Sequence, residues 1–166
     1  MADQQSKGVV LVVGAGDATG GSIAKRFALQ GYEAVITRRN EDKLRGITDE
    51  IRAAGGVVHP FGVDARREEE MVPFIKRIED QIGAIEIAVY NVGGNVRFGI
   101  AETTSRVFFK VWEMCCFGGF LMGREVSNHM RTRGRGTIIF TGATASVRGG
   151  EGYSAFATGK HGLRAL

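Results

Sequence analysis

The strongest constraint on the fold is a short apolar strand that runs directly into a glycine-rich turn. Residues 8–13 read GVVLVV, a β-branched run typical of a strand buried on both faces of a sheet. Residues 14–21 then read GAGDATGG, and residues 19–30 are predicted to form a helix. A buried strand, a glycine turn and a helix in this order predict the first unit of a parallel α/β sheet.

The alternation of strands and helices continues along the chain. Further strands are predicted at 32–37, 57–61, 85–90 and 137–141, and further helices at 41–54, 68–82, 104–130 and 153–166. Short connections between them favour right-handed βαβ units. We therefore expect one Rossmann-type domain over residues 1–166, a doubly wound parallel sheet in a three-layer α/β/α arrangement. The chain ends inside its last predicted helix, so we expect the domain to be incomplete at its C-terminus.

Charge and cysteine content narrow the possible partners. The formal net charge of +4 is mild and suits an anionic ligand. The densest basic run, at residues 131–135, is interpreted as a solvated loop rather than a nucleic-acid contact. Cys115 and Cys116 are adjacent, so we expect neither a disulfide framework nor a metal site. The polar N-terminus and the lack of a long apolar run indicate a soluble, cytoplasmic protein without a membrane partner.

The glycine turn predicts an anion site. Glycines let the backbone approach a pyrophosphate, and the N-terminus of the following helix offers free N–H groups and a positive dipole end. The residues predicted to bind a dinucleotide at this turn are Gly14, Gly16, Asp17, Thr19 and Gly20.

The end of the second strand predicts which dinucleotide is preferred. An acid at this position binds the adenosine ribose hydroxyls, whereas an arginine accommodates a 2′-phosphate. The sequence has Arg38 and Arg39 here and no acid, which favours NADP(H) over NAD(H). Asp17 in the glycine turn works against this preference, and two solvated arginines are the alternative interpretation.

These features together resemble the short-chain dehydrogenase/reductase family along all 166 residues. The resemblance is carried by the GAGDATGG turn, in which Ala18 replaces the middle glycine, by Asp64, by Asn91-Val92-Gly93 and by Lys160. It implies that Asp64 binds the adenine amino group, that Asn91 and Gly93 belong to the cofactor site, and that Lys160 holds the nicotinamide ribose. An unpaired lysine in a half-empty cleft is the alternative for Lys160.

The resemblance also implies a catalytic set from which this chain departs. The family uses an Asn, a Ser and a Tyr-x-x-x-Lys pair, and only Lys160 matches. Phe156 stands at the Tyr position, Ala143 at the Ser position and Cys115 at the Asn position. Acid–base catalysis contributes a factor of roughly 10² to 10⁴ in rate, and a phenyl ring donates no proton. We therefore expect little conventional carbonyl reduction.

Two functions remain open from the sequence. One is an NADP(H)-dependent oxidoreductase with an altered active site, acting on an unknown small molecule; the other is a non-catalytic NADP(H)-binding sensor or partner subunit. Hydroxyl groups of Tyr153, Thr144 or Ser146 are the candidates to replace the missing proton donor. The resemblance further implies a homodimer or homotetramer that pairs through its long helices.

Overall fold

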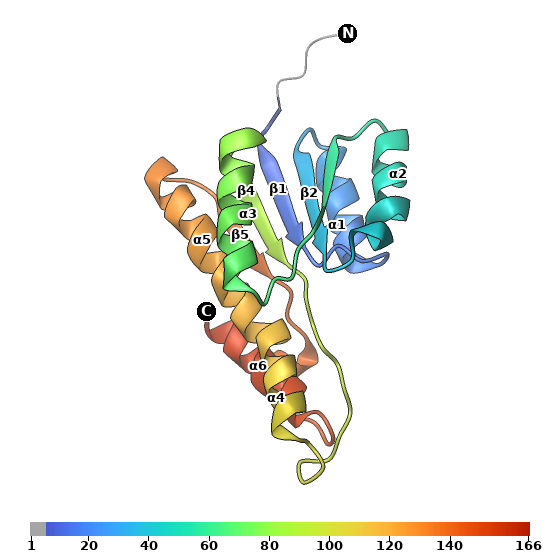
Figure 1. Cartoon of the computed structure of the whole chain (residues 1–166), viewed down its shortest axis with the longest axis vertical. Helices are drawn as coiled ribbons and strands as arrows, with labels where there is room; N and C mark the ends of the chain where they lie inside the picture. The colour runs from blue at the N-terminus through green and yellow to red at the C-terminus, as the bar shows by residue number, and fades with distance from the viewer. Residues whose placement is uncertain (1–5) are drawn as a thin grey trace.

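The computed structural model describes residues 6–166 and confirms the expected α/β fold (Figure 1). Five parallel strands form one sheet in the order β3-β2-β1-β4-β5. The strands are β1 (Val9–Val13), β2 (Glu33–Arg38), β3 (Val58–Gly62), β4 (Ile85–Tyr90) and β5 (Thr137–Phe140). The order reverses between β1 and β4, and ligands of such sheets bind beside the carboxyl ends of the strands at this point.

The central strand β1 explains why the domain has three layers. All five of its side chains are buried, as its β-branched run predicts. Val9, Leu11 and Val13 belong to one hydrophobic cluster, whereas Val10 and Val12 belong to another. Alternate side chains of a strand point to opposite faces, so each cluster fills the space beneath one layer of helices.

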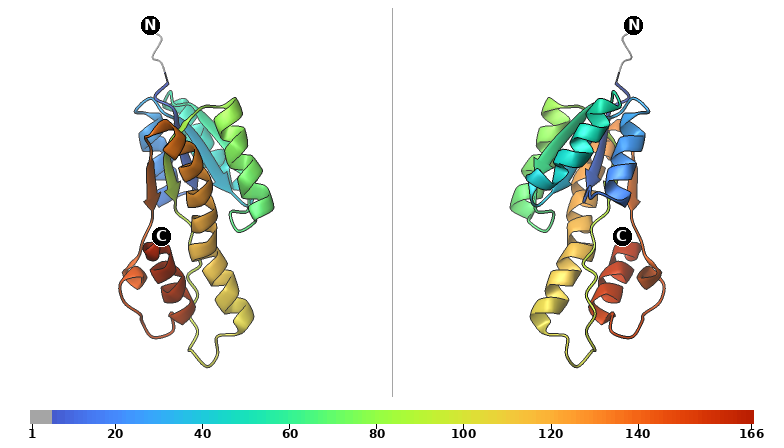
Figure 2. Two further views of the ribbon diagram at one scale, coloured as in Figure 1. Left: turned by 90° about the vertical axis from the view of Figure 1, so that its left-hand side faces the viewer. Right: turned by 90° about the vertical axis from the view of Figure 1, so that its right-hand side faces the viewer.

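Two helices cover each face of the sheet (Figures 1 and 2). On one face, α1 (Thr19–Ala28) and α2 (Arg45–Ala53) bury their apolar sides. On the other face, α3 (Glu68–Gln81) and α5 (Gly118–Arg133) do the same. The predicted helix 41–54 begins with a 3₁₀ turn, η1 (Glu41–Leu44).

The predicted helix 104–130 is interrupted by a π-helical turn. It consists of α4 (Ser105–Trp112), η2 (Glu113–Phe117) and α5. The buried Tyr90 donates its hydroxyl to the carbonyl oxygen of Met114 inside η2, at 2.7 Å. A π-turn frees helical carbonyls from their usual partners, and π-turns are frequent at functional sites.

The last elements extend past the sheet, on the side to which the strands point (Figure 2). There α4 packs against α6 (Ser154–Ala165), which follows the short 3₁₀ turn η3 (Thr144–Ser146). In the basic segment 131–135, Arg133 pairs with Glu79 and Arg135 with Glu86, so two of its arginines hold carboxylates. Among residues 6–166, no helix is long and apolar enough to cross a membrane.

Candidate active site

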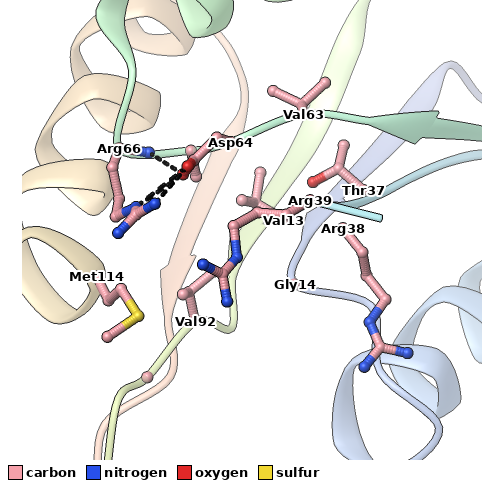
Figure 3. Close-up of a pocket in the computed structure, with 12 residues that line it drawn as sticks. Val13, Gly14, Thr37, Arg38, Arg39, Val63, Asp64, Arg66, Val92 and Met114 are labelled. Atoms are coloured by element: carbon pink, nitrogen blue, oxygen red, sulfur yellow. Dashed lines mark hydrogen bonds and ion pairs between the residues drawn. The ribbon is translucent and has the colours of Figure 1, made fainter. Parts of the chain in front are cut away.

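A cavity of about 160 Å³ lies beside the carboxyl ends of β1 to β4 (Figure 3). Most of its walls come from segments that the sequence predicts to bind a dinucleotide. It is lined by Val13, Gly14, Thr37, Arg38, Arg39, Val63, Asp64, Ala65, Arg66, Val92, Gly93 and Met114. Five of the predicted cofactor residues, from four different segments, therefore share one cavity: Gly14, Arg38, Arg39, Asp64 and Gly93.

The glycine turn is packed too tightly to hold side chains at Gly14, Gly20 and Gly21. Gly14 has a positive φ of 88°, and a Cβ there would lie 2.6 Å from the carbonyl oxygen of Asn91. A Cβ at Gly20 would collide with the carbonyl oxygen of Gly14. At Gly16, by contrast, an added Cβ meets no atom within 4 Å. The backbone of the turn is thus open at Gly16, just before α1 begins at Thr19.

Asn91 connects the glycine turn to the end of β4. Its side-chain amide donates to the carbonyl oxygen of Gly14 at 3.1 Å, and its backbone N–H donates to the carbonyl oxygen of Val13 at 2.8 Å. The predicted site residue Asn91 therefore holds the turn in place from the neighbouring strand. Its side chain fixes the path of the backbone around Gly14.

The two arginines after β2 point in different directions (Figure 3). Arg39 extends across the cavity between Val13 and Val92, whereas Arg38 points away toward the glycine turn. The Arg38 guanidinium lies 3.6 Å from the exposed carboxylate of Asp17 and donates to the carbonyl oxygen of Lys43 at 3.1 Å. The sequence predicts both arginines for the same task, but the structure places only Arg38 beside the turn.

Asp64 is already paired inside the cavity (Figure 3). Its carboxylate accepts hydrogen bonds from Arg66 Nη2 at 2.6 Å and Arg66 Nε at 2.9 Å. These side-chain bonds hold the pKa of Asp64 below its usual value, and they raise the pKa of Arg66. The sequence reasoning missed Arg66, although its position two residues after Asp64 allows the turn in which the Arg66 N–H also donates to Asp64.

Lys160 and Phe156 lie together at Gly93. A Cβ at Gly93 would be 3.7 Å from the Phe156 ring and 3.9 Å from the Lys160 ammonium nitrogen. That nitrogen donates to the carbonyl oxygens of Thr141 at 2.8 Å and Val92 at 3.2 Å. Burial lowers the pKa of Lys160. Lys160 is therefore held by backbone carbonyls, and one of its three N–H donors has no hydrogen-bond partner among residues 6–166.

Cys115 occupies a packed position in η2. Its Sγ accepts a hydrogen bond from the Gly94 N–H at 3.4 Å, and its side chain is fully buried. Burial raises the pKa of the thiol. A thiol held protonated in this way is a poor nucleophile, which agrees with the interpretation of Cys115 as a packing residue.

The three hydroxyl groups considered as substitutes lie in different surroundings. Ser146 is buried, and its Oγ accepts a hydrogen bond from the Ala143 N–H at 3.0 Å. Thr144 and Tyr153 instead line a second cavity together with Ala143 and Phe156. Helix α6 begins at Ser154, so Tyr153 immediately precedes the helix. Thr144 and Tyr153 therefore lie at the cavity beside Phe156, whereas Ser146 lines a separate cavity together with Lys160.

Comparison with protein families agrees with this geometry. The family model described as short chain dehydrogenase matches residues 8–166. Among solved structures, a short-chain dehydrogenase from Rhodopseudomonas palustris is 50% identical, with a TM-score of 0.91 over 95% of this chain and 74% of that one. A metagenomic short-chain oxidoreductase in complex with NADP is 25% identical, with a TM-score of 0.93 over 98% of this chain and 74% of that one.

Curated relatives are more distant in sequence. A putative ketoacyl reductase from Streptomyces coelicolor is 28% identical over 98% of this chain and 63% of its own length. The 2,3-dihydro-2,3-dihydroxybenzoate dehydrogenase of Bacillus subtilis is 28% identical over 92% of this chain and 58% of its own length. The chain thus spans about three-fifths of the length of these relatives.

Proposed function

The chain belongs to the short-chain dehydrogenase family, and we propose that it is an NADP(H)-binding oxidoreductase with an altered active site. The observation that carries the proposal is the contrast around Gly93. Lys160 is present and anchored there, but its neighbour is the Phe156 ring rather than a phenol. The residues expected to bind the cofactor are thus present, whereas the groups expected to transfer a proton are absent.

The residues around the first cavity fit an NADP(H) molecule. The tight backbone at Gly14 and Gly20, with open space at Gly16, is the cradle that a pyrophosphate needs. We assign the backbone N–H groups of Gly16, Asp17 and Thr19 to the phosphate contact, Arg38 to the 2′-phosphate and Asp64 to the adenine. A solved relative that contains NADP supports this choice of cofactor.

The remaining residues of the site would act on the nicotinamide half. A bound nicotinamide supplies or accepts a hydride at a carbon of the substrate, while the substrate oxygen gains or loses one proton. Lys160 would direct its third N–H to the nicotinamide ribose, and Gly93 leaves room for the ring. Phe156 supplies only an apolar wall, so the proton must come from Thr144, Tyr153 or water.

A second candidate function is a non-catalytic NADP(H)-binding sensor or partner subunit. It is favoured because Phe156, Ala143 and Cys115 lack the hydroxyl and amide groups that the family has at these positions. We also propose a homodimer or homotetramer. The exposed aromatic side chains of Phe109 and Phe120 on the long helix support such pairing. Light scattering on the purified protein measures the oligomeric state directly.

Titration with NADPH and NADH by calorimetry tests the proposed cofactor. We expect NADPH to bind at least tenfold more tightly than NADH, because only NADPH carries the phosphate that Arg38 can pair with. Lack of binding by either nucleotide would refute the assignment. The two candidate functions are then separated by the triple variant Ala143→Ser/Phe156→Tyr/Cys115→Asn. Reductase activity of this variant toward aldehydes and ketones supports the altered enzyme, and complete inactivity supports the non-catalytic protein.

A further inference from the structure

A second cavity, of about 580 Å³, opens beside Phe156. It shares no lining residue with the cavity assigned to the dinucleotide. Its volume lies within the range typical of small-molecule sites, roughly 300 to 1,000 Å³. The lining residues are Asn95, Ala143, Thr144, Ala145, Arg148, Gly149, Gly150, Tyr153 and Phe156. Because Phe156 and Ala143 stand at the proposed reaction centre, a molecule in this cavity would lie next to it.

The polar lining of this cavity is rich in hydrogen-bond donors. Arg148 is its one charged residue, and no carboxylate lines it. The amide of Asn95 and the hydroxyls of Thr144 and Tyr153 add neutral donors. A cavity with a guanidinium and no carboxylate favours a ligand of negative charge over a neutral or cationic one.

Among residues 6–166, the guanidinium of Arg148 holds no acid and so is available to a ligand. Within residues 6–166 its side chain makes neither an ion pair nor a hydrogen bond, whereas Arg66 and Arg133 are each paired with a carboxylate. Arg97 adds a second cation nearby: a Cβ at Gly152, just before Tyr153, would lie 2.8 Å from the Arg97 Cγ. In the same described range, Arg97 also pairs with no acid. The neighbouring carboxylate of Glu151 thus neutralises neither arginine by direct contact.

We propose that this cavity binds a small carbonyl or alcohol substrate that carries a carboxylate, with Arg148 as the carboxylate-binding residue. A guanidinium matches a carboxylate through two parallel hydrogen bonds, which fixes the orientation of the ligand as well as its charge. The reacting carbon then faces Phe156 and Ala143. This inference rests on the proposed function: an oxo acid would take up one hydride and one proton and leave as the hydroxy acid.

Ligand-observed NMR with a matched pair of probes tests the inference. The probes are 4-oxopentanoate and its methyl ester, which differ in charge but share the ketone. Each is titrated into the purified protein with and without saturating NADP⁺. Arg148→Met removes the charge at similar length, Arg148→Lys retains it, and Arg26→Met is the control. Arg26 is exposed on α1, lines neither cavity and holds no acid in the described chain.

We expect the acid to bind at least tenfold more tightly than the ester. Arg148→Met should remove this difference, Arg148→Lys should keep part of it, and Arg26→Met should leave it unchanged. Equal binding of acid and ester, an unchanged preference in Arg148→Met, or no binding of the acid at millimolar concentration overturns the proposal. The NADPH titration of the same variants is a separate readout. If NADPH fails to bind but the acid preference depends on Arg148, the cofactor assignment is wrong and the carboxylate site stands.

Discussion

The ammonium nitrogen of Lys160 lies 2.8 Å from the carbonyl oxygen of Thr141 and 3.2 Å from that of Val92. These two carbonyls follow the neighbouring strands β5 and β4, so one side chain from α6 ties two strand ends together. Lys160 is only 4% exposed, and it lies beside the Phe156 ring at Gly93. It therefore has a structural role that does not depend on a tyrosine partner.

Replacing Lys160 by Met should destabilise the protein. The change leaves two carbonyl oxygens without their donor, and an unsatisfied buried polar group costs about 1–3 kcal/mol. Methionine regains some apolar contact, so we expect a net loss within this range and a fall in Tm of several degrees. Thermal unfolding of Lys160→Met is compared with Lys110→Met, an exposed position on α4. An equal Tm for the two variants would contradict the structural role.

Alanine should destabilise the protein at one glycine of the turn and have little effect at another. Gly20→Ala places a methyl group against the carbonyl oxygen of Gly14 and 2.9 Å from the Asn91 amide, so the backbone must shift. Overpacking of this kind typically costs about 1–3 kcal/mol. Gly16→Ala meets no atom within 4 Å and should change stability by less than about 0.5 kcal/mol. Urea unfolding measures both, and a larger loss for Gly16→Ala would show that the turn is packed differently.

The sequence predicts the order and bounds of the strands well because local and long-range signals agree there. The β-branched run of β1 needs burial on both faces, and only a central parallel strand provides it. The strand Ile85–Tyr90 is predicted to the residue. Gly14 and Gly20 are recognised because close backbone contacts exclude every other residue type. In each case the amino-acid type is dictated by the backbone environment.

Other features depend on contacts that no local pattern reveals. The π-turn η2 is accompanied by the hydrogen bond between Tyr90 and Met114, which are 24 positions apart. Arg38 and Arg39 have the same side chain but point in different directions, because Arg38 pairs with Asp17 and Arg39 extends into the cavity. The cavity beside Arg148 likewise forms only when the segments that line it come together.

Asp17 should weaken NADPH binding. Its exposed carboxylate lies 3.6 Å from the Arg38 guanidinium, so it competes with a 2′-phosphate for the same cation. Asp17→Asn removes this charge while keeping the side-chain size. We expect the Kd for NADPH to fall severalfold and the Kd for NADH to change little, as measured by calorimetry. A similar gain for both nucleotides would place the effect of Asp17 at the pyrophosphate instead.

The arginines provide the matched test of cofactor selectivity. Arg38→Ala should reduce NADPH affinity at least tenfold relative to NADH, because it removes the cation beside the glycine turn. Arg39→Ala should weaken the binding of both nucleotides by a similar factor, because Arg39 crosses the cavity assigned to the dinucleotide (Figure 3). Competition binding of the two nucleotides to each variant gives the ratio directly. If only Arg39→Ala loses the preference for NADPH over NADH, then Arg39 rather than Arg38 binds the 2′-phosphate.

The stability of the protein should fall at alkaline pH. Burial raises the pKa of the Cys115 and Cys116 thiols above their ordinary value of 9.0. The unfolded chain then loses these protons at lower pH than the folded one, so the stabilisation is complete below pH 9 and is lost as pH rises toward the folded pKa values. Urea unfolding between pH 7 and about pH 10 measures this slope.

Cys115→Ala/Cys116→Ala lowers stability throughout by leaving space in the core, but it should flatten the slope. The buried Tyr90 has a raised pKa and steepens the loss, whereas Lys160, with a lowered pKa, opposes it; both remain in the double variant. An unchanged slope would therefore assign the pH dependence to Tyr90 rather than to the thiols.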